Sequence, residues 1–201
     1  MSGSSQAEGV ALGFRVKTGR AVAVVLVGPL ASPRVAVRQD LVLYDEAVPD
    51  SFQPYHAGLE LAPRQAEATV RRLSEVVRKV SMTVVELLID ELNAAGMDPC
   101  SAGIVVRSLV DPSTIRNPHM HAHAAEGRLF FESVVAGLER TDMKAAVHAE
   151  TDLHEHAAKV LRATEGSLDR DVVAMGMAFG KPWRLEEKAA ALAAWVALSG
   201  R

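Results

Sequence analysis

Residues Gly13 to Leu26, "GFRVKTGRAVAVVL", predict two strands joined by a tight turn. Valine is frequent in the second arm, and glycines flank both the first arm and the "KTG" turn at 17–19, as in a β-hairpin. We therefore predict strands at 10–16 and 20–28. The turn end of this hairpin carries three cations, Arg15, Lys17 and Arg20, in an otherwise apolar segment.

The rest of the chain predicts a mixed α/β order. Apolar and polar residues alternate over 33–45, which indicates a third strand with one covered face. Three prolines in 46–63 exclude regular structure there, so this segment is predicted to be a loop. The further elements that we predict are a long helix at 64–95, a strand at 102–110, a helix from Pro118 to about Arg140, a strand at 144–150 and helices at 151–163, 166–180 and 183–199.

Length and composition favour an ordinary globular protein. With 201 residues, 49% apolar and 23% charged, the chain is long enough for one substantial core. We expect a flexible tail at 1–9 followed by one domain at 10–201. Cys100 is the only cysteine, and no apolar run approaches the length of a membrane span, so we expect a cytoplasmic protein without a membrane partner. A net charge of −3 means that any phosphate binding must come from a local patch.

Three strands followed by alternating helices and strands make one mixed sheet flanked by helices. This order, with "GFRVKTGRA", "GIVVRSLV", "AHAAEGRLFFESVVAGL" and "RLEEKAAALAAWVAL" at the corresponding places, resembles the ribonuclease H-like superfamily, and within it the RuvC-type resolvases. The resemblance implies an α/β fold with a five-stranded mixed sheet, in the order βββαβαβα with extra C-terminal helices.

The same resemblance implies a two-metal nuclease site, which this sequence does not keep. Such nucleases hold two metal ions with acidic groups of the first strand, the fourth strand and the last helix. Here Arg15 stands at the first-strand position and the fourth-strand position falls near Arg107, while Glu186 and Glu187 keep the acidic start of the last helix. The standard nuclease mechanism is therefore not expected.

Cations at this edge of the sheet suggest a different use. Ligands of open α/β sheets favour the strand ends, and guanidinium and ammonium groups suit phosphate or carboxylate. The candidate ligand-binding residues are Arg15, Lys17, Arg20 and Arg107. The alternative is that these cations only pair with nearby acids, namely Glu150, Asp152, Glu186 and Glu187.

A second constellation is "NPHMHAHAAEG" at 117–127. On a helix, His119, His123 and Glu126 share one face, which we expect to flank a buried stripe of Met120, Ala124, Gly127, Phe131 and Leu138. Imidazoles one turn apart and a carboxylate form a candidate divalent-metal site, which His148 and Glu150 of the next strand would complete. The simpler alternative is a polar first turn with neutral, hydrogen-bonding imidazoles.

Two functions follow from these patterns. The first is a non-catalytic or strongly divergent ribonuclease H-like domain that binds an anionic small molecule, a nucleic acid backbone or a protein partner. The alternative is a divergent metal-dependent hydrolase or nuclease that uses His123, Glu150, Glu186 and Glu187, with His123, Glu186 and Glu187 as catalytic candidates. Self-association through the third strand or the loop at 49–58 is a further prediction, which the sequence leaves open.

Overall fold

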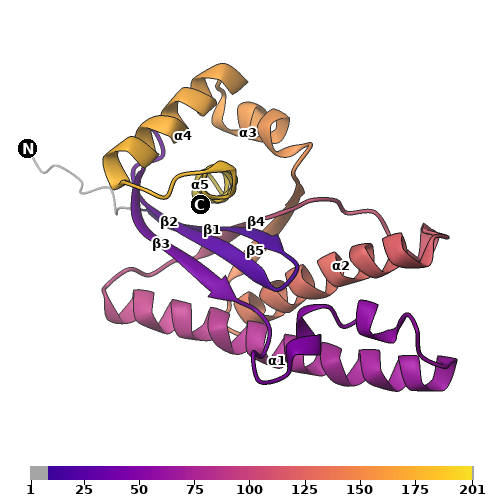
Figure 1. The fold of residues 1–201 in the computed structure, drawn as a ribbon. Coiled ribbons are helices and arrows are strands. Elements are labelled where there is room, and N and C mark those ends of the chain that lie inside the picture. The colour runs from indigo at the N-terminus through magenta and orange to yellow at the C-terminus, as the bar shows by residue number, and fades with distance from the viewer. Residues whose placement is uncertain (1–8, 201) are drawn as a thin grey trace, which may run out of the picture.

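The computed structural model describes residues 9–200 and shows one five-stranded sheet between two layers of helices (Figure 1). The strands are β1 (Gly9–Lys17), β2 (Arg20–Gly28), β3 (Arg34–Val42), β4 (Ser101–Val106) and β5 (Lys144–Ala149). The α-helices are α1 (Pro63–Ala94), α2 (Pro118–Glu139), α3 (Leu153–Leu161), α4 (Glu165–Phe179) and α5 (Leu185–Leu198). Of the predicted tail at 1–9, residues 1–8 lie outside the described residues, and Gly9 already belongs to β1.

The sheet has the order β3-β2-β1-β4-β5, which confirms the predicted mixed topology. β1, β2 and β3 form an antiparallel meander, whereas β4 and β5 run parallel to β1. The predicted hairpin closes with Lys17 opposite Arg20, and Gly19 adopts a φ of 74°, a left-handed conformation that glycine tolerates well. The carboxyl ends of β1, β4 and β5 therefore meet at one edge of the sheet.

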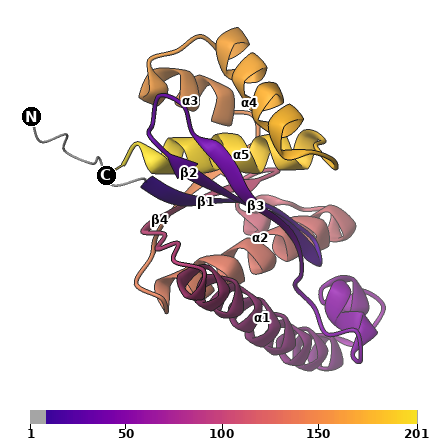
Figure 2. The same ribbon diagram turned by 90° about the vertical axis from the view of Figure 1, so that its left-hand side faces the viewer.

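Helices α1 and α2 cover one face of the sheet, and α3, α4 and α5 cover the other (Figure 2). Helix α5 packs directly on β1 and β4 because two glycines let the backbones approach. A Cβ atom on Gly13 would lie 1.8 Å from the carbonyl oxygen of Ala190, and one on Gly103 would lie 2.4 Å from that of Ala193. This close packing fixes the start of α5 at the carboxyl edge of the sheet.

Several local predictions were wrong. Strand β4 ends at Val106 rather than 110, because its neighbour β5 ends at Ala149, opposite Val106, and the chain beyond is exposed. The loop at 46–63 contains two short 3₁₀-helices, Pro49–Phe52 and His56–Gly58. Pro49 occupies the first position of one of these turns and Pro63 that of α1, where proline is well tolerated, so the prolines did not exclude regular structure.

The buried face of α2 is also rotated from the prediction. Met120 is 55% exposed, whereas Glu126 is fully buried beside Ala122 and Ala125. The reason is that α2 packs against both α1 and the His56–Gly58 turn, so a polar residue faces inward where the turn offers it partners. None of the helices within residues 9–200 combines the length and apolarity of a membrane-spanning segment.

Candidate functional site

Arg15 occupies the centre of the carboxyl edge of the sheet. It lies on β1 opposite Val105 of β4, and its side chain is only 5% exposed. Its Nη1 donates to the carbonyl oxygen of Val16 at 2.9 Å, and its Nη2 donates to Oε2 of Glu150, just after β5, at 2.7 Å. A buried guanidinium and its ion pair thus fill the first-strand position of the implied metal site.

Glu186, in the first turn of α5, faces the hairpin. Its Oε1 accepts hydrogen bonds from Nζ of Lys17 and, at 2.8 Å, from Nη2 of Arg20. Burial alone would raise the pKa of Glu186, but the bonds from Lys17 and the charge of Arg20 outweigh it, so the pKa lies below its ordinary value. Lys17 and Arg20 are about half exposed and share this one carboxylate.

Glu187 is buried and binds Arg38 of β3. Nη2 of Arg38 donates to its Oε1 at 2.6 Å, and the backbone N–H of Arg184 donates to its Oε2 at 2.8 Å. Burial opposes ionisation of Glu187, yet these hydrogen bonds prevail and lower its pKa. The second bond caps the N-terminus of α5, so the same carboxylate also starts the helix.

We call these residues the ion-paired edge: Arg15, Lys17, Arg20, Arg38, Glu150, Glu186 and Glu187. The edge does not fit the two-metal site that the fold implies, because each of its carboxylates is already hydrogen-bonded to a cation. The fourth candidate acid, Asp152, instead accepts from the hydroxyl of Thr151. Arg107 is exposed and, within residues 9–200, its side chain makes no hydrogen bond or ion pair.

His56, His119 and His123 form a second group, the histidine cluster. One ring nitrogen from each can be chosen so that all three lie within 4.8 Å of one another. Nε2 of His119 and Nε2 of His123 are 3.1 Å apart, and the ring of His56 lies 4.8 Å and 4.4 Å from theirs, centroid to centroid. His119 and His123 come from the first turns of α2, and His56 opens the second 3₁₀-helix.

Glu126 lies behind the histidine cluster and holds His56 in place. Its Oε1 accepts from the backbone N–H of His56 at 3.1 Å and lies 2.8 Å from Nδ1 of the same residue. Nε2 of His56 and Oε2 of Glu126 are buried and have no hydrogen-bond partner among residues 9–200. Desolvation and the adjacent His56 and His119 rings lower the pKa of His123 below 6.5.

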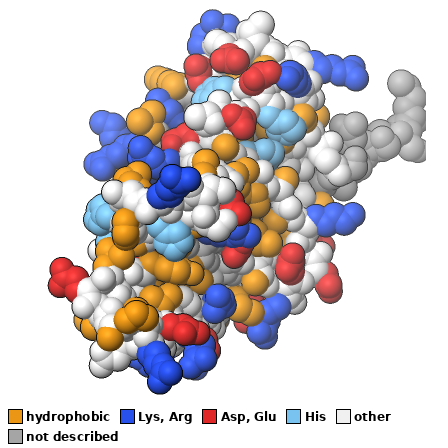
Figure 3. Space-filling model, turned by 90° about the vertical axis from the view of Figure 1, so that its right-hand side faces the viewer, with side chains coloured by type: hydrophobic (Ala, Val, Ile, Leu, Met, Phe, Trp, Pro, Cys, Tyr) orange, Lys and Arg blue, Asp and Glu red, His pale blue; other side chains and the backbone are white. Residues whose placement is uncertain are grey.

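The predicted five-residue metal set is divided by the fold. His119, His123 and Glu126 lie together, but Glu150 binds Arg15, and His148 lies against His156 of α3 at 4.9 Å between ring centroids. Burial, followed by the charge of His156, lowers the pKa of His148. Figure 3 shows histidine side chains in two separate groups on this face of the molecule.

His56 is the residue that the sequence did not reveal. It stands in a segment predicted to be an irregular loop, far in the sequence from His119 and His123. No spacing rule joins such positions. The signal available was only the presence of a histidine in a long, proline-containing connection.

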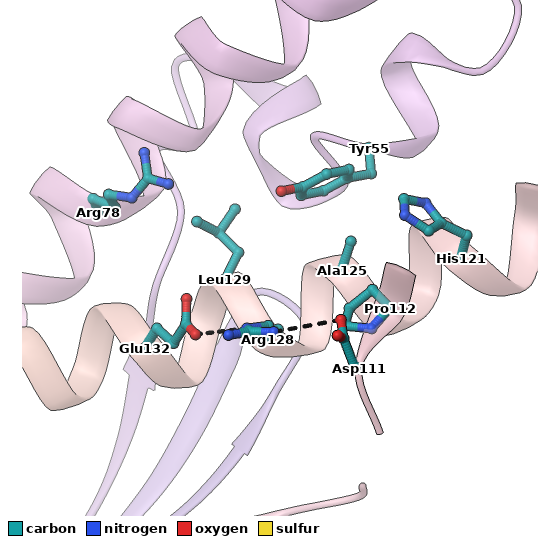
Figure 4. A pocket seen from close by; sticks show the side chains of 9 residues that line it. All are labelled: Tyr55, Arg78, Asp111, Pro112, His121, Ala125, Arg128, Leu129 and Glu132. Atoms are coloured by element: carbon teal, nitrogen blue, oxygen red, sulfur yellow. Dashed lines mark hydrogen bonds and ion pairs between the residues drawn. The ribbon is translucent and has the colours of Figure 1, made fainter. Parts of the chain in front are cut away.

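A cavity of about 230 Å³ lies beside the cluster, between the 3₁₀ segment, α1 and α2 (Figure 4). Three of its charged groups pair with one another: Arg128 bonds Oε1 of Glu132 at 2.6 Å and lies 3.6 Å from Oδ1 of Asp111. None of the predicted site residues lines it. The lining residues are Tyr55, Arg78, Asp111, Pro112, His121, Ala125, Arg128, Leu129 and Glu132.

The architecture is the ribonuclease H-like fold of the RuvC type. Two similar solved structures are both of RuvC from Thermus thermophilus. One, in complex with a Holliday junction substrate, has a TM-score of 0.55 and 8% sequence identity, over 94% of this chain and 91% of that chain. The other has a TM-score of 0.54 and 8% identity, over 93% and 92% of the two chains. No protein-family model and no curated protein sequence matches the chain.

Proposed function

We propose that this protein is a ribonuclease H-like domain that binds the phosphate backbone of nucleic acid at its ion-paired edge and does not cut it by two-metal catalysis. The observation that carries the proposal is the pairing of buried Arg15 with Glu150. A divalent ion placed there would meet the guanidinium charge at close range, and like charges repel strongly where water is excluded.

The exposed cations of the edge support backbone binding. Lys17 and Arg20 share the single carboxylate of Glu186, so one positive charge of this trio is left uncompensated. Arg107, at the end of β4, adds an exposed charge without a partner among the described residues. These side chains lie on an open surface rather than in the cavity of Figure 4, which suits an extended polyanion better than a small anion.

The similarity to RuvC bound to a Holliday junction makes nucleic acid the first polyanion to test. The alternative, a metal-dependent hydrolase using His123, Glu150, Glu186 and Glu187, has less support. Its carboxylates are occupied by cations, and His123 belongs to a separate cluster with His56 and His119. Self-association through β3 or residues 49–58 stays a prediction.

The test is fluorescence anisotropy with labelled single-stranded, duplex and four-way-junction DNA at several salt concentrations. We expect the logarithm of the binding constant to fall linearly with log[salt], because the protein displaces counterions from the phosphates. The double variant Lys17→Glu/Arg20→Glu should weaken binding by about 10-fold or more, since it reverses two charges at the phosphate contact.

A charge-matched control is Arg71→Glu/Arg72→Glu on the exposed side of α1, which should leave the affinity unchanged. Equal weakening by both double variants would mean only a global charge effect and would refute the assigned surface. Cleavage of any of these DNAs with Mg²⁺ or Mn²⁺, abolished by Glu186→Gln, would overturn the non-catalytic part of the proposal.

A further inference from the structure

We infer that His56, His119 and His123 bind a divalent transition-metal ion, with zinc as the best match, at a site separate from the ion-paired edge. This inference does not depend on nucleic acid binding. It rests on the distances within the cluster, on the unpaired atoms around it and on the position of Glu126.

The distances suit a tetrahedral ion. With Zn–N bonds of about 2.0 Å and tetrahedral angles, two coordinating nitrogens lie about 3.3 Å apart. Nε2 of His119 and Nε2 of His123 are already 3.1 Å apart. The chosen ring nitrogen of His56 is no further than 4.8 Å from either, so small rotations of the exposed His119 and His123 side chains toward His56 close the set.

Glu126 supplies the support that metal-binding histidines usually have. Such a histidine commonly donates its second ring N–H to a carboxylate, which fixes the tautomer and the ring orientation. Nδ1 of His56 lies 2.8 Å from the fully buried Oε1 of Glu126, so Nε2 of His56 is the ring nitrogen that faces a metal ion in this arrangement. The backbone N–H of His56 donates to the same oxygen, so the carboxylate fixes both the turn and the ring.

The unpartnered ring nitrogen of His56 supports a ligand at this place. Nε2 of His56 is buried and unpartnered among the described residues, and a buried polar group without a partner destabilises the fold. A hydrogen bond between His119 and His123 would satisfy one nitrogen of each of those rings, but it would leave Nε2 of His56 without a partner among the described residues. A metal ion satisfies all three nitrogens at once.

The chemistry of the donors selects the ion. Three neutral imidazoles suit zinc, while magnesium and calcium prefer oxygen ligands. No fourth histidine, cysteine or carboxylate joins the group within residues 9–200, so the fourth position is open to water or to an exogenous ligand. His119 and His123 are exposed, which gives the ion a direct route from solvent. Binding would join the 3₁₀ turn of His56–Gly58 to the start of α2.

The test is zinc titration of metal-free protein, by calorimetry and by competition with a chromophoric chelator. We expect one zinc ion per chain in the wild type and loss of that binding in His56→Ala, His119→Ala and His123→Ala. Because His119 and His123 are exposed, their variants should fold like the wild type, which thermal unfolding without metal would check. Glu126→Gln should weaken zinc binding by about 10- to 100-fold, as loss of an outer carboxylate does.

The matched control is the double variant His154→Ala/His156→Ala, which removes two histidines from α3 and should bind zinc like the wild type. Zinc should also raise the unfolding temperature of the wild type and of this control, but not that of His119→Ala, because a ligand stabilises only the state that binds it. Absence of stoichiometric zinc binding by the folded wild type would overturn the inference. Zinc binding that survives all three cluster substitutions would overturn it equally.

Discussion

The ion-paired edge and the histidine cluster differ in how far their polar groups are satisfied. At the edge, Glu150, Glu186 and Glu187 each bind at least one cation, and their cations come from β1, β2 and β3. In the cluster, His56 and Glu126 each bury an atom that no described residue partners. The carboxylates of the edge therefore already have cationic partners, whereas one buried atom each of His56 and Glu126 has none among the described residues.

The difference between these two regions affects where a functional site should be sought in a protein that has diverged from others of the same fold. The carboxyl edge of the sheet, where ligands of open α/β sheets usually bind, holds a network of ion pairs. The unpartnered buried atoms of His56 and Glu126, an imidazole nitrogen and a carboxylate oxygen, lie elsewhere, beside the start of α2. If the proposed zinc site is correct, unmet hydrogen-bonding capacity is a better guide to a metal here than position within the fold.

The largest loss of stability is expected at Gly13, where α5 packs against β1 beneath the ion-paired edge. Gly13→Ala places a Cβ atom 1.8 Å from the carbonyl oxygen of Ala190, so β1 and α5 must separate. We expect a loss of about 3 kcal/mol or more in the free energy of unfolding, at the upper end of overpacking effects. Urea denaturation would measure it.

Gly127→Ala is the matched control beside the histidine cluster. No atom lies within 4 Å of the Cβ position of Gly127, and the residue is inside α2, so alanine should stabilise the helix by about 1 kcal/mol. A similar loss in both variants would refute the assigned packing of α5 on β1.

The next largest loss of stability is expected from removing Arg15, the central cation of the ion-paired edge. Arg15→Ala deletes a buried guanidinium together with its bonds to Val16 and Glu150. Because Glu150 is half exposed and stays hydrated, we expect a loss of about 2 kcal/mol rather than the larger loss typical of fully buried pairs. His119→Ala in the cluster, measured without metal, should change stability by less than about 0.5 kcal/mol. Equal losses would mean that the two regions do not differ as described.

The ion pair between Glu187 and Arg38 should also make the free energy of unfolding depend on pH. The folded-state pKa of Glu187 lies below its ordinary value of 4.5, so its stabilising contribution is complete above that value and is lost as the pH falls through the folded pKa. Glu187→Gln should therefore lose about 1 kcal/mol in the free energy of unfolding near pH 7, and its difference from the wild type should shrink as the pH falls below 4.5. Unfolding free energies at several pH values would measure this.

The exposed pair Lys159–Glu155 provides the control for that experiment. Glu155→Gln should shift stability by less than about 0.5 kcal/mol at every pH, because exposed ion pairs contribute little. If the difference in unfolding free energy between Glu187→Gln and the wild type does not change with pH, the charge of the carboxylate is not what stabilises the start of α5.

The sequence predicted the strands and α-helices well, but it predicted the residues of the candidate sites only in part. Valine-rich arms around a glycine turn, the prolines at the starts of α1 and α2, and the alternation of later segments predicted every strand and α-helix in order, but not the short 3₁₀-helices. Arg15, Glu186 and Glu187 were predicted near one another because the resemblance to RuvC-type resolvases implies that the first strand and the start of the last helix meet at one edge of the sheet. His56 was missed because its approach to α2 depends on how an irregular segment folds, which no periodicity encodes. The inward turn of Glu126 was missed for the same reason, since His56 is its partner.

The smallest effect is expected at Arg107, the edge cation without a partner among the described residues. Arg107→Ala should leave stability unchanged, since no described contact is lost. If the proposed surface is correct, it should reduce the salt dependence of DNA binding by about one phosphate contact, a change in slope of about 1. An unchanged slope would exclude Arg107 from the binding surface.

Anomalous diffraction from crystals grown with zinc and with manganese tests the contrast between the two regions most directly. The account predicts a zinc peak between His56, His119 and His123, and no manganese peak at Glu150, Glu186 or Glu187. Manganese peaks at those carboxylates, with Arg15 displaced, would contradict it and restore a two-metal nuclease site at the edge of the sheet.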